Sequence, residues 1–216
     1  MKIEGIIFDF DGTLFSSMHI WRSLAVKVLE RNGIKTNEDV NKLIYNMNIR
    51  EAADFMVKHY GVSKTPNEIL QETEDILKKA YNEEIQPKPG VLEFLQRMKV
   101  QGVKMCIATA TDHYLVEAAL KRCHMLHYFE NIFTCSEVGY GKDHPYIYNH
   151  AVAFLQTNMS ETAVFEDAYY AAKTAKLAGF KLVGIYDEYE PQQNELKEIS
   201  DIYLTDFLLE GETLWT

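Results

Sequence analysis

The sequence has few of the features that mark secreted or membrane-spanning proteins. Its 216 residues include three cysteines, Cys106, Cys123 and Cys135, which are odd in number and not closely spaced. A disulfide framework or a structural zinc site is therefore not expected. No segment approaches the roughly 20 consecutive apolar residues that cross a bilayer, and the first ten residues lack the pattern of a signal peptide. We expect a cytoplasmic protein that does not bind a membrane.

Basic residues are also scarce. The chain has 22 Lys and Arg against 32 Asp and Glu, which gives a formal net charge of -10. Nucleic acids and anionic membranes both bind basic surfaces, so neither is an expected partner, and a small metabolite is favoured instead. The length and the hydrophobic content of 47% allow one good core, or one core with a small second lobe. We expect a monomer.

Short apolar runs rich in β-branched residues alternate with longer stretches of helical period, and from residue 90 onward this alternation is regular. Such alternation predicts a parallel sheet with helices on both faces. The predicted strands are residues 4–10, 104–110, 130–136, 162–167, 181–187 and 201–207. The fold class expected from this pattern is α/β, with a doubly wound, Rossmann-like parallel sheet.

The stretch between residues 15 and 85 contains no predicted strand. "MHIWRSLAVKVLERNG" (18–33) has apolar residues at helical spacing and ends in a glycine, and the segments 37–48, 49–61 and 67–84 also have a helical pattern. We therefore predict an all-helical cap domain at 15–85, inserted into a catalytic core formed by 1–14 and 86–216. Pro87 and Pro89 are expected to stiffen the return of the chain to the core.

Chemically active side chains follow several of the predicted strands. Ligands of open parallel sheets bind beyond the carboxyl ends of the strands, where the strand order reverses. If these strands are neighbours, one cleft brings together Asp9, Asp11, Thr109, Thr111, Lys142, Glu166 and Asp167. Four crowded carboxylates raise one another's pKa values, and a divalent cation relieves this. Hard oxygen ligands suit Mg²⁺ better than zinc, and a lysine can hold a phosphate beside the ion.

The pair of acids in "DFDGT" has a chemical explanation. A carboxylate beside a metal-bound phosphate can attack phosphorus and form an aspartyl-phosphate, while a second acid protonates the leaving oxygen and later deprotonates water. We assign these roles to Asp9 and Asp11, which share one face if the chain stays extended. Gly12 then permits a sharp turn, and Thr13 is expected to cap the segment that follows.

Four motifs, "DFDGTL", "IATAT", "GYGKDHP" and "VFED", resemble in their order and spacing the signature of the haloacid dehalogenase-like superfamily, over residues 3 to about 187. The helical insertion resembles the cap of the subgroup that includes β-phosphoglucomutase and phosphoglycolate phosphatase. This resemblance implies a Mg²⁺-dependent phosphotransferase in which Asp9 is the nucleophile and Asp11 the acid/base. It also implies phosphate binding by Thr109, Ala110 and Lys142, and metal binding by Asp9, Glu166, Asp167 and the backbone carbonyl of Asp11.

The chain also departs from the pattern of that subgroup. Ser16 replaces an acid, Trp21 stands where the mutases carry a histidine, and Ala171 replaces a glycine in "EDAYYA". In the predicted cap, Trp21 and Arg50 are candidate substrate contacts, although Trp21 is equally consistent with cap core and Arg50 with a solvated helix start. The expected function is hydrolysis of a small phosphorylated metabolite. The alternatives are a sugar-phosphate mutase and a catalytically idle phosphate-binding or regulatory protein.

Overall fold

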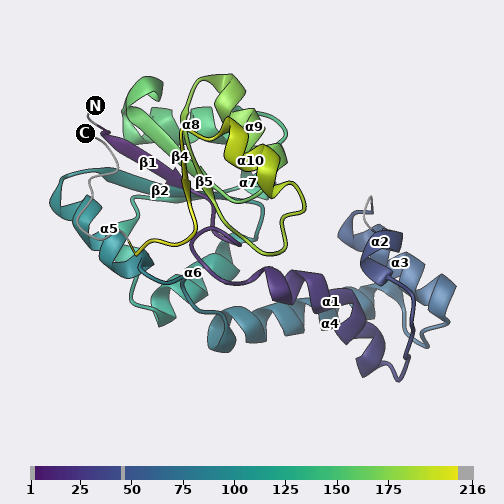
Figure 1. The fold of residues 1–216 in the computed structure, drawn as a ribbon. Helices are drawn as coiled ribbons and strands as arrows, with labels where there is room; N and C mark the ends of the chain where they lie inside the picture. Colours follow the sequence, from purple (N-terminus) through teal and green to yellow (C-terminus); the bar gives the residue numbers. More distant parts are fainter. Residues whose placement is uncertain (1–2, 45–46, 209–216) are drawn as a thin grey trace. The chain divides into compact units, whose positions relative to one another are not determined.

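The computed structural model describes residues 3–44 and 47–208, and the chain forms two compact units. One unit comprises Met1–Ser17 with Ile85–Thr216, and the other comprises Met18–Glu84. All the strands of the described residues belong to the first, which we call the sheet unit, and the second is the helical unit (Figure 1). In the described part of the chain, no helix combines the length and the apolar character that a membrane span requires.

The sheet unit is built on parallel strands in the order β3-β2-β1-β4-β5-β6. The strands are β1 (Gly5–Phe8), β2 (Lys104–Thr109), β3 (Ile132–Thr134), β4 (Thr162–Glu166), β5 (Lys181–Ile185) and β6 (Ile202–Leu204). All six predicted strands are confirmed with shorter bounds. Because the chain adds β2 and β3 on one side of β1 and the later strands on the other, the strand order reverses between β1 and β4, the place where such sheets bind ligands.

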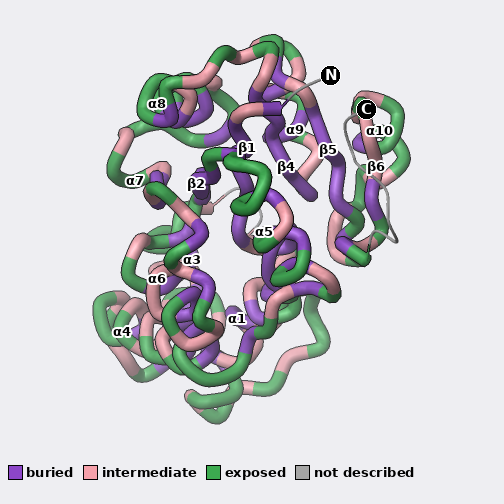
Figure 2. Tube along the Cα trace, turned by 90° about the vertical axis from the view of Figure 1, so that its left-hand side faces the viewer, coloured by how far each residue is buried: buried purple, intermediate pink, exposed green. Residues whose placement is uncertain are grey.

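Consecutive residues of β1 point to opposite faces of the sheet and show which helices cover each face. Ile7 packs in a buried cluster with Tyr148 of α8 and Ala175 of α9. The ring of Phe8 meets the ring of Phe94 of α5 edge to face, with 6.2 Å between centroids. The predicted α/β fold with two helical layers is confirmed. Figure 1 shows α8, α9 and α10 over one face with α5 and α6 over the other, and Figure 2 shows β1, β4 and β5 buried between them.

The sheet unit has α-helices between its strands, and α7 shows how local sequence sets the two ends of one of them. Their bounds are α5 (Val91–Val100), α6 (His113–Arg122), α7 (Cys135–Val138), α8 (Tyr146–Leu155), α9 (Tyr169–Ala178) and α10 (Gln193–Ile199). α7 begins with a capping box, in which Thr134 accepts a hydrogen bond from the backbone of Glu137 and the Glu137 side chain accepts one in return. It ends at Gly139 in the left-handed conformation, which glycine adopts without strain.

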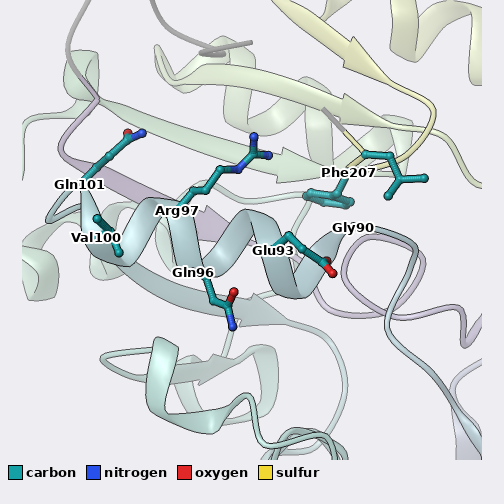
Figure 3. A pocket seen from close by; sticks show the side chains of 8 residues that line it. Gly90, Glu93, Gln96, Arg97, Val100, Gln101 and Phe207 are labelled. Carbon is teal, nitrogen blue, oxygen red and sulfur yellow. The ribbon is translucent and has the colours of Figure 1, made fainter. Parts of the chain in front are cut away.

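The N-terminus of α5 packs against Phe207, in the segment that follows β6. Gly90 has φ +81°, and a Cβ built on it would lie 2.4 Å from the carbonyl carbon of Phe207, so a side chain does not fit there. The backbone N–H of Phe207 donates to the carbonyl of Pro89 at 3.0 Å, an ordinary length for such a hydrogen bond. A groove of about 640 Å³ runs along α5 from Phe207 to Val100 (Figure 3). The contacts of Pro89 and Gly90 with Phe207 hold the chain that returns from the helical unit in place within the sheet unit.

The helical unit contains α1 (Met18–Arg31), α2 (Val40–Ile44), α3 (Ile49–Tyr60), α4 (Pro66–Lys79) and a π-helical turn, η1 (Ala80–Glu84). α3 and α4 each begin with a capping box, on Asn48 and Thr65 respectively. The four predicted helical segments are confirmed, but α2 is shorter than the predicted segment 37–48, of which residues 45–46 lie outside the described residues.

The two stretches of the sheet unit that lead to and from the helical unit are paired with each other. Phe15 and Pro87 form an antiparallel bridge. The N–H of Ser16 donates to the carbonyl of Gln86 at 2.9 Å, and the N–H of Lys88 donates to the carbonyl of Leu14 at 2.8 Å. The segment that follows Asp11 is therefore held by backbone hydrogen bonds to the returning chain.

Candidate active site

Three buried carboxyl groups meet at the switch point of the sheet. Asp9 follows β1, Glu166 is the last residue of β4, and Asp167 comes directly after it. Their ligand oxygens all lie within 4.8 Å of one another. They meet because β1 and β4 are hydrogen-bonded neighbours, with Phe8 paired to Phe165 and the N–H of Asp9 donating to the Phe165 carbonyl at 2.9 Å.

Lys142 places an ammonium group among these acids. It lies in the loop between α7 and α8, and its side chain is almost completely buried. Its Nζ donates to Oδ1 of Asp9 and, at 2.9 Å, to Oε2 of Glu166. One lysine balances the charge of only one of the three carboxylates, so the cluster keeps an excess of negative charge in a buried position.

The pKa values of the cluster reflect burial first and the crowding of negative charge second. Burial, followed by the charge of Glu166, raises the pKa of Asp9 to about 6, against the opposing effect of Lys142. Burial and the charges of Asp9 and Glu166 raise the pKa of Asp167 well above its usual value. Burial by itself would lower the pKa of Lys142, but the charges of Asp9 and Glu166 raise it well above the ordinary value. A bound divalent cation favours the ionised carboxylates and so opposes the upward shifts that burial and crowding cause, and the oxygen-only donor set fits a hard cation.

The turn after Asp9 brings the backbone against Asp167. Gly12 has φ +81°, and a Cβ there would lie 2.2 Å from Oδ2 of Asp167. Thr13 donates from its hydroxyl to Oδ1 of Asp167 at 2.8 Å. The prediction that Thr13 caps a following helix is wrong, because α1 begins only at Met18 and the hydroxyl is used on Asp167 instead. Gly12 and Thr13 together fix the orientation of this carboxylate.

Asp11 is half-buried and is held by two hydroxyl groups. Its Oδ1 accepts a 2.5 Å hydrogen bond from Ser17, and its Oδ2 accepts a 2.6 Å hydrogen bond from Thr111. The extended chain on which the shared face of Asp9 and Asp11 was predicted to depend does not continue through these residues. β1 ends at Phe8, and the backbone turns at residues 10–14, so Asp11 is positioned by the turn and by these two hydroxyl groups.

The residues predicted to bind phosphate lie at the end of β2 and in the loop after α7. Thr109 is buried, and its hydroxyl accepts a hydrogen bond from the N–H of Thr111 at 3.0 Å. Ala110, between them, is exposed. The chain therefore bends sharply after Thr109, and Lys142 reaches the cluster from the neighbouring loop. These residues belong to the same carboxyl edge of the sheet.

Ser17 and Tyr148 are residues of the site that the sequence did not predict. Ser17 holds Asp11 together with Thr111, which was predicted to lie in the cleft. Tyr148 of α8 is buried, and its hydroxyl oxygen lies 3.4 Å from Oε2 of Glu166 and 3.5 Å from the carbonyl oxygen of Ala171, so its single proton has two acceptors within reach. Tyr148 lies in an apolar helical stripe, so the sequence contains no signal that separates it from an ordinary core residue.

The two candidate residues of the helical unit both contact other residues of that unit. The Trp21 indole N–H donates to the hydroxyl of Tyr81 at 2.9 Å, and Trp21 lines a pocket of about 230 Å³ in the helical unit together with Ala25 and Met56. Arg50 is exposed at the start of α3, where its guanidinium donates to Oδ1 of Asn67 at 3.2 Å.

The family of the chain follows from comparison with known proteins. The family model of the haloacid dehalogenase-like hydrolases matches residues 6–185, which contain every clustered residue described above. The chain belongs to this family, and the assignment made from the four motifs is confirmed. As a member of this family, the chain is an enzyme of the hydrolase class.

Individual relatives are moderately similar over nearly the whole chain. A phosphorylated carbohydrates phosphatase of Thermotoga maritima is 25% identical over 181 residues, 84% of each protein. The validoxylamine A 7'-phosphate phosphatase of Streptomyces hygroscopicus subsp. limoneus is 26% identical, over 86% of this chain and 87% of that protein. The structure of CbbY from Rhodobacter sphaeroides with phosphate has a TM-score of 0.76 at 23% identity, over 95% of both chains, which shows a shared fold.

Proposed function

We propose that this protein is a Mg²⁺-dependent phosphatase that hydrolyses a small phosphorylated metabolite through an aspartyl-phosphate. The observation that carries the proposal is the buried group of Asp9, Glu166 and Asp167 with the ammonium of Lys142 between two of the acids. This arrangement combines a carboxylate nucleophile with a cation that attracts a phosphate. The names of the sequence relatives support phosphate monoesters as the substrate class.

The proposed reaction has two steps. In the first, an oxygen of Asp9 attacks the phosphorus atom and the bond to the leaving oxygen breaks, while Asp11 gives its proton to that oxygen. In the second, Asp11 takes a proton from a water molecule that attacks the phosphorus of the aspartyl-phosphate. Phosphate leaves, and both carboxyl groups return to their starting states. Lys142 holds the phosphate oxygens throughout, and the phosphate-binding role extends to Thr109 and the backbone at Ala110.

The metal-binding residues of the proposal are Asp9, Asp167 and Glu166, whose ligand oxygens lie within 4.8 Å of one another. The backbone carbonyl of Asp11 is a further ligand that the family resemblance implies. A bound Mg²⁺ supplies neutralisation of the phosphate charge and orients the phosphate for attack. Within the protein, Glu166 has a second task because its Oε2 accepts from Lys142 and its Oε1 accepts from the N–H of Ala168 at 3.2 Å. It therefore orients the lysine as well as adding negative charge to the site.

Sugar phosphates are the favoured substrates in this proposal. One supporting observation is the phosphorylated carbohydrates phosphatase among the relatives. The other is the fold shared with a CbbY mutant, which has a TM-score of 0.77 and 22% identity to this chain and whose structure contains xylulose-(1,5)bisphosphate. Trp21 and Arg50 remain candidate substrate contacts on the helical unit. A mutase is less favoured, since Trp21 stands where the mutases carry a histidine and its indole N–H is engaged by Tyr81.

A phosphate-release assay tests the proposal. Purified protein with Mg²⁺ is offered p-nitrophenyl phosphate and a panel of sugar, nucleoside and organic-acid phosphates, and inorganic phosphate is measured. We expect release from sugar phosphates, no release after chelation, and loss of turnover in Asp9→Asn, which replaces the attacking oxygen by a neutral amide. Asp143→Asn, an exposed acid beside Lys142, is the matched control and should stay active.

Two outcomes would contradict the proposed function. Isomerisation of a hexose 1-phosphate without phosphate release would identify a mutase. A protein that binds phosphate with Mg²⁺ but hydrolyses no member of the panel would be a binding or regulatory protein.

A further inference from the structure

Lys142 is a buried residue on an exposed loop. The loop begins at Gly139, which ends α7 in the left-handed conformation, and it ends where α8 starts at Tyr146. The N–H of His144 donates to the carbonyl of Gly141 at 3.1 Å, which closes a tight turn around Lys142 and Asp143. Apart from Lys142, residues 140–144 of this loop are exposed. The position of the buried ammonium therefore depends on a turn that has little core packing of its own.

Three aromatic rings close the two ends of this turn against each other. Tyr140, directly before the turn, stacks on His144 at its end, with 4.8 Å between ring centroids and 25° between ring planes. Tyr140 also packs on Tyr146, the first residue of α8, with 5.0 Å between centroids. The N–H of Tyr146 donates to Nδ1 of His144 at 3.2 Å. We call Tyr140, His144 and Tyr146 the aromatic clasp.

The same surface provides an internal comparison for the clasp. Further ring contacts continue along α8, from Tyr146 to His150, then to Phe133 and on to Phe154. Phe154 lies near the C-terminal end of α8 and is 49% exposed, whereas Tyr140 is 48% exposed. Both are exposed members of one row of rings, but Tyr140 flanks the Lys142 turn and Phe154 is at the other end of the row. Truncation of each removes similar aromatic surface.

We propose that the aromatic clasp positions Lys142 for catalysis, so that Tyr140, His144 and Tyr146 are positioning residues of the reaction. The inference rests on the proposed function for the role of Lys142. The clasp fixes the ends of the turn, the turn fixes the backbone of Lys142, and Nζ then reaches Oδ1 of Asp9 and Oε2 of Glu166 together. Stacked rings give a surface loop a defined geometry, and small displacements of a group that contacts the nucleophile reduce turnover.

Two measurements on the variants Tyr140→Ala, Tyr140→Phe and Phe154→Ala test the clasp. Hydrogen–deuterium exchange of peptides covering residues 139–150 reports the order of the loop without requiring any activity. Steady-state kinetics on a phosphate monoester test whether the order of the loop affects the reaction. The melting temperature of each variant monitors global stability. We expect faster exchange in Tyr140→Ala and a fall in kcat of about two- to tenfold, the size of one aromatic contact. The melting temperature should stay close to wild type.

The two control variants separate stacking from general loss of packing. Tyr140→Phe keeps the ring and should retain both the slow exchange of the loop and the wild-type kcat. Phe154→Ala should likewise leave the exchange of the loop and kcat unchanged. A second pair separates the two contacts of His144: His144→Asn offers an acceptor without the ring, and His144→Phe offers the ring without the acceptor. If the stack is decisive, His144→Phe retains more activity than His144→Asn.

Three results would overturn the inference. Unchanged exchange in Tyr140→Ala would show that the rings do not order the loop. Faster exchange with unchanged kcat would show that loop order does not position Lys142. Equal losses of kcat in Tyr140→Ala and Phe154→Ala would reduce the effect to surface packing. A wild-type protein without phosphatase activity would instead contradict the proposed function, and the exchange measurement would still decide whether the clasp orders the loop.

Discussion

The hydroxyl of Ser17 donates a 2.5 Å hydrogen bond to Oδ1 of Asp11. The opposite oxygen, Oδ2, accepts from Thr111 at 2.6 Å, so the carboxyl group is held between a residue before α1 and a residue after β2. An acid/base must present its proton in a fixed direction to be effective. These two hydroxyl groups therefore set the orientation from which Asp11 exchanges a proton in the proposed reaction.

We expect Ser17→Ala to lower kcat by about tenfold, since it removes one of the two groups that orient Asp11 and leaves the nucleophile in place. Ser16→Ala is the matched control, because Ser16 is adjacent and exposed and uses its backbone N–H, which alanine keeps, to bond Gln86. Steady-state kinetics of both variants check the prediction. Equal activities of the two variants would show that the Ser17 hydroxyl has no part in catalysis.

Gly12→Ala should greatly reduce activity and weaken the response to Mg²⁺. The new Cβ would lie 2.2 Å from Oδ2 of Asp167, so the carboxylate or the turn must move. Gly102→Ala separates this contact from backbone strain, because Gly102 has a similar φ of +74° but no atom within 4 Å of the Cβ position. Both variants should lose stability by about 1 kcal/mol or more from the left-handed conformation, and only Gly12→Ala should show the weakened response to Mg²⁺. Phosphate release over a Mg²⁺ titration distinguishes them.

The fold was predictable because its signals are local and periodic. Each strand of the sheet unit is a short apolar run, and each helix of the helical unit has apolar residues at helical spacing, so both element types and their order followed from the sequence. The meeting of Asp9 with Glu166 and Asp167 was predictable because parallel strands present their carboxyl ends at one edge. The family match of residues 6–185 agrees with the four motifs.

Contacts that depend on side-chain direction were not predictable. Threonine is a common helix-capping residue, but the Thr13 hydroxyl donates a hydrogen bond to Asp167 because the turn at Gly12 brings the two side chains together. Tyr148 contacts Glu166 from a helix whose stripe is otherwise apolar. Lys88 lies between Pro87 and Pro89, in the segment predicted to stiffen the return of the chain to the core. Its buried partner, Asp187, is remote in the sequence. Such contacts require the packing of elements that local patterns do not specify.

Lys88 and Asp187 form a buried ion pair that anchors the returning chain to the end of β5. Their side chains are 9% and 7% exposed, and Nζ lies 3.1 Å from Oδ2 of Asp187. The same Nζ donates to the carbonyl of Tyr186 at 2.6 Å. Asp187→Ala leaves the ammonium buried without its counterion, so we expect a loss of about 3 kcal/mol in the free energy of unfolding.

Urea unfolding measures this effect in the single variant Asp187→Ala and in a double variant that combines Lys88→Met with Asp187→Leu. The double variant removes both charges and should recover much of the loss. An exposed pair, Lys121 and Glu117 at 2.8 Å, provides the comparison: Glu117→Ala should cost less than about 1 kcal/mol. A loss for Asp187→Ala as small as that of Glu117→Ala would show that the buried pair does not anchor the crossing.

The stabilisation that Mg²⁺ provides should increase with pH over the range in which Asp9 titrates. Burial, with the charge of Glu166, raises the pKa of Asp9 in the fold to about 6 from an ordinary value of 3.8. An acid with a raised pKa binds its proton more tightly in the folded state. Its contribution therefore stabilises the metal-free protein below about pH 4 and is lost as the pH rises to about 6. Mg²⁺ requires the carboxylate, so protons compete with it over the same interval.

Melting temperatures with Mg²⁺ and with chelator, at several pH values from about 5 to 8, check this prediction. The difference between the two temperatures at each pH cancels the titration of groups outside the site. We expect this difference to be small near pH 5 and to reach its full size above about pH 7, and in Asp9→Asn it should be smaller and less dependent on pH. Asp167, whose pKa burial also raises, changes the difference in the same direction. A difference that is constant across the range in the wild-type protein would show that Mg²⁺ binds without displacing a proton from the cluster, and Asp9 would then not be a ligand.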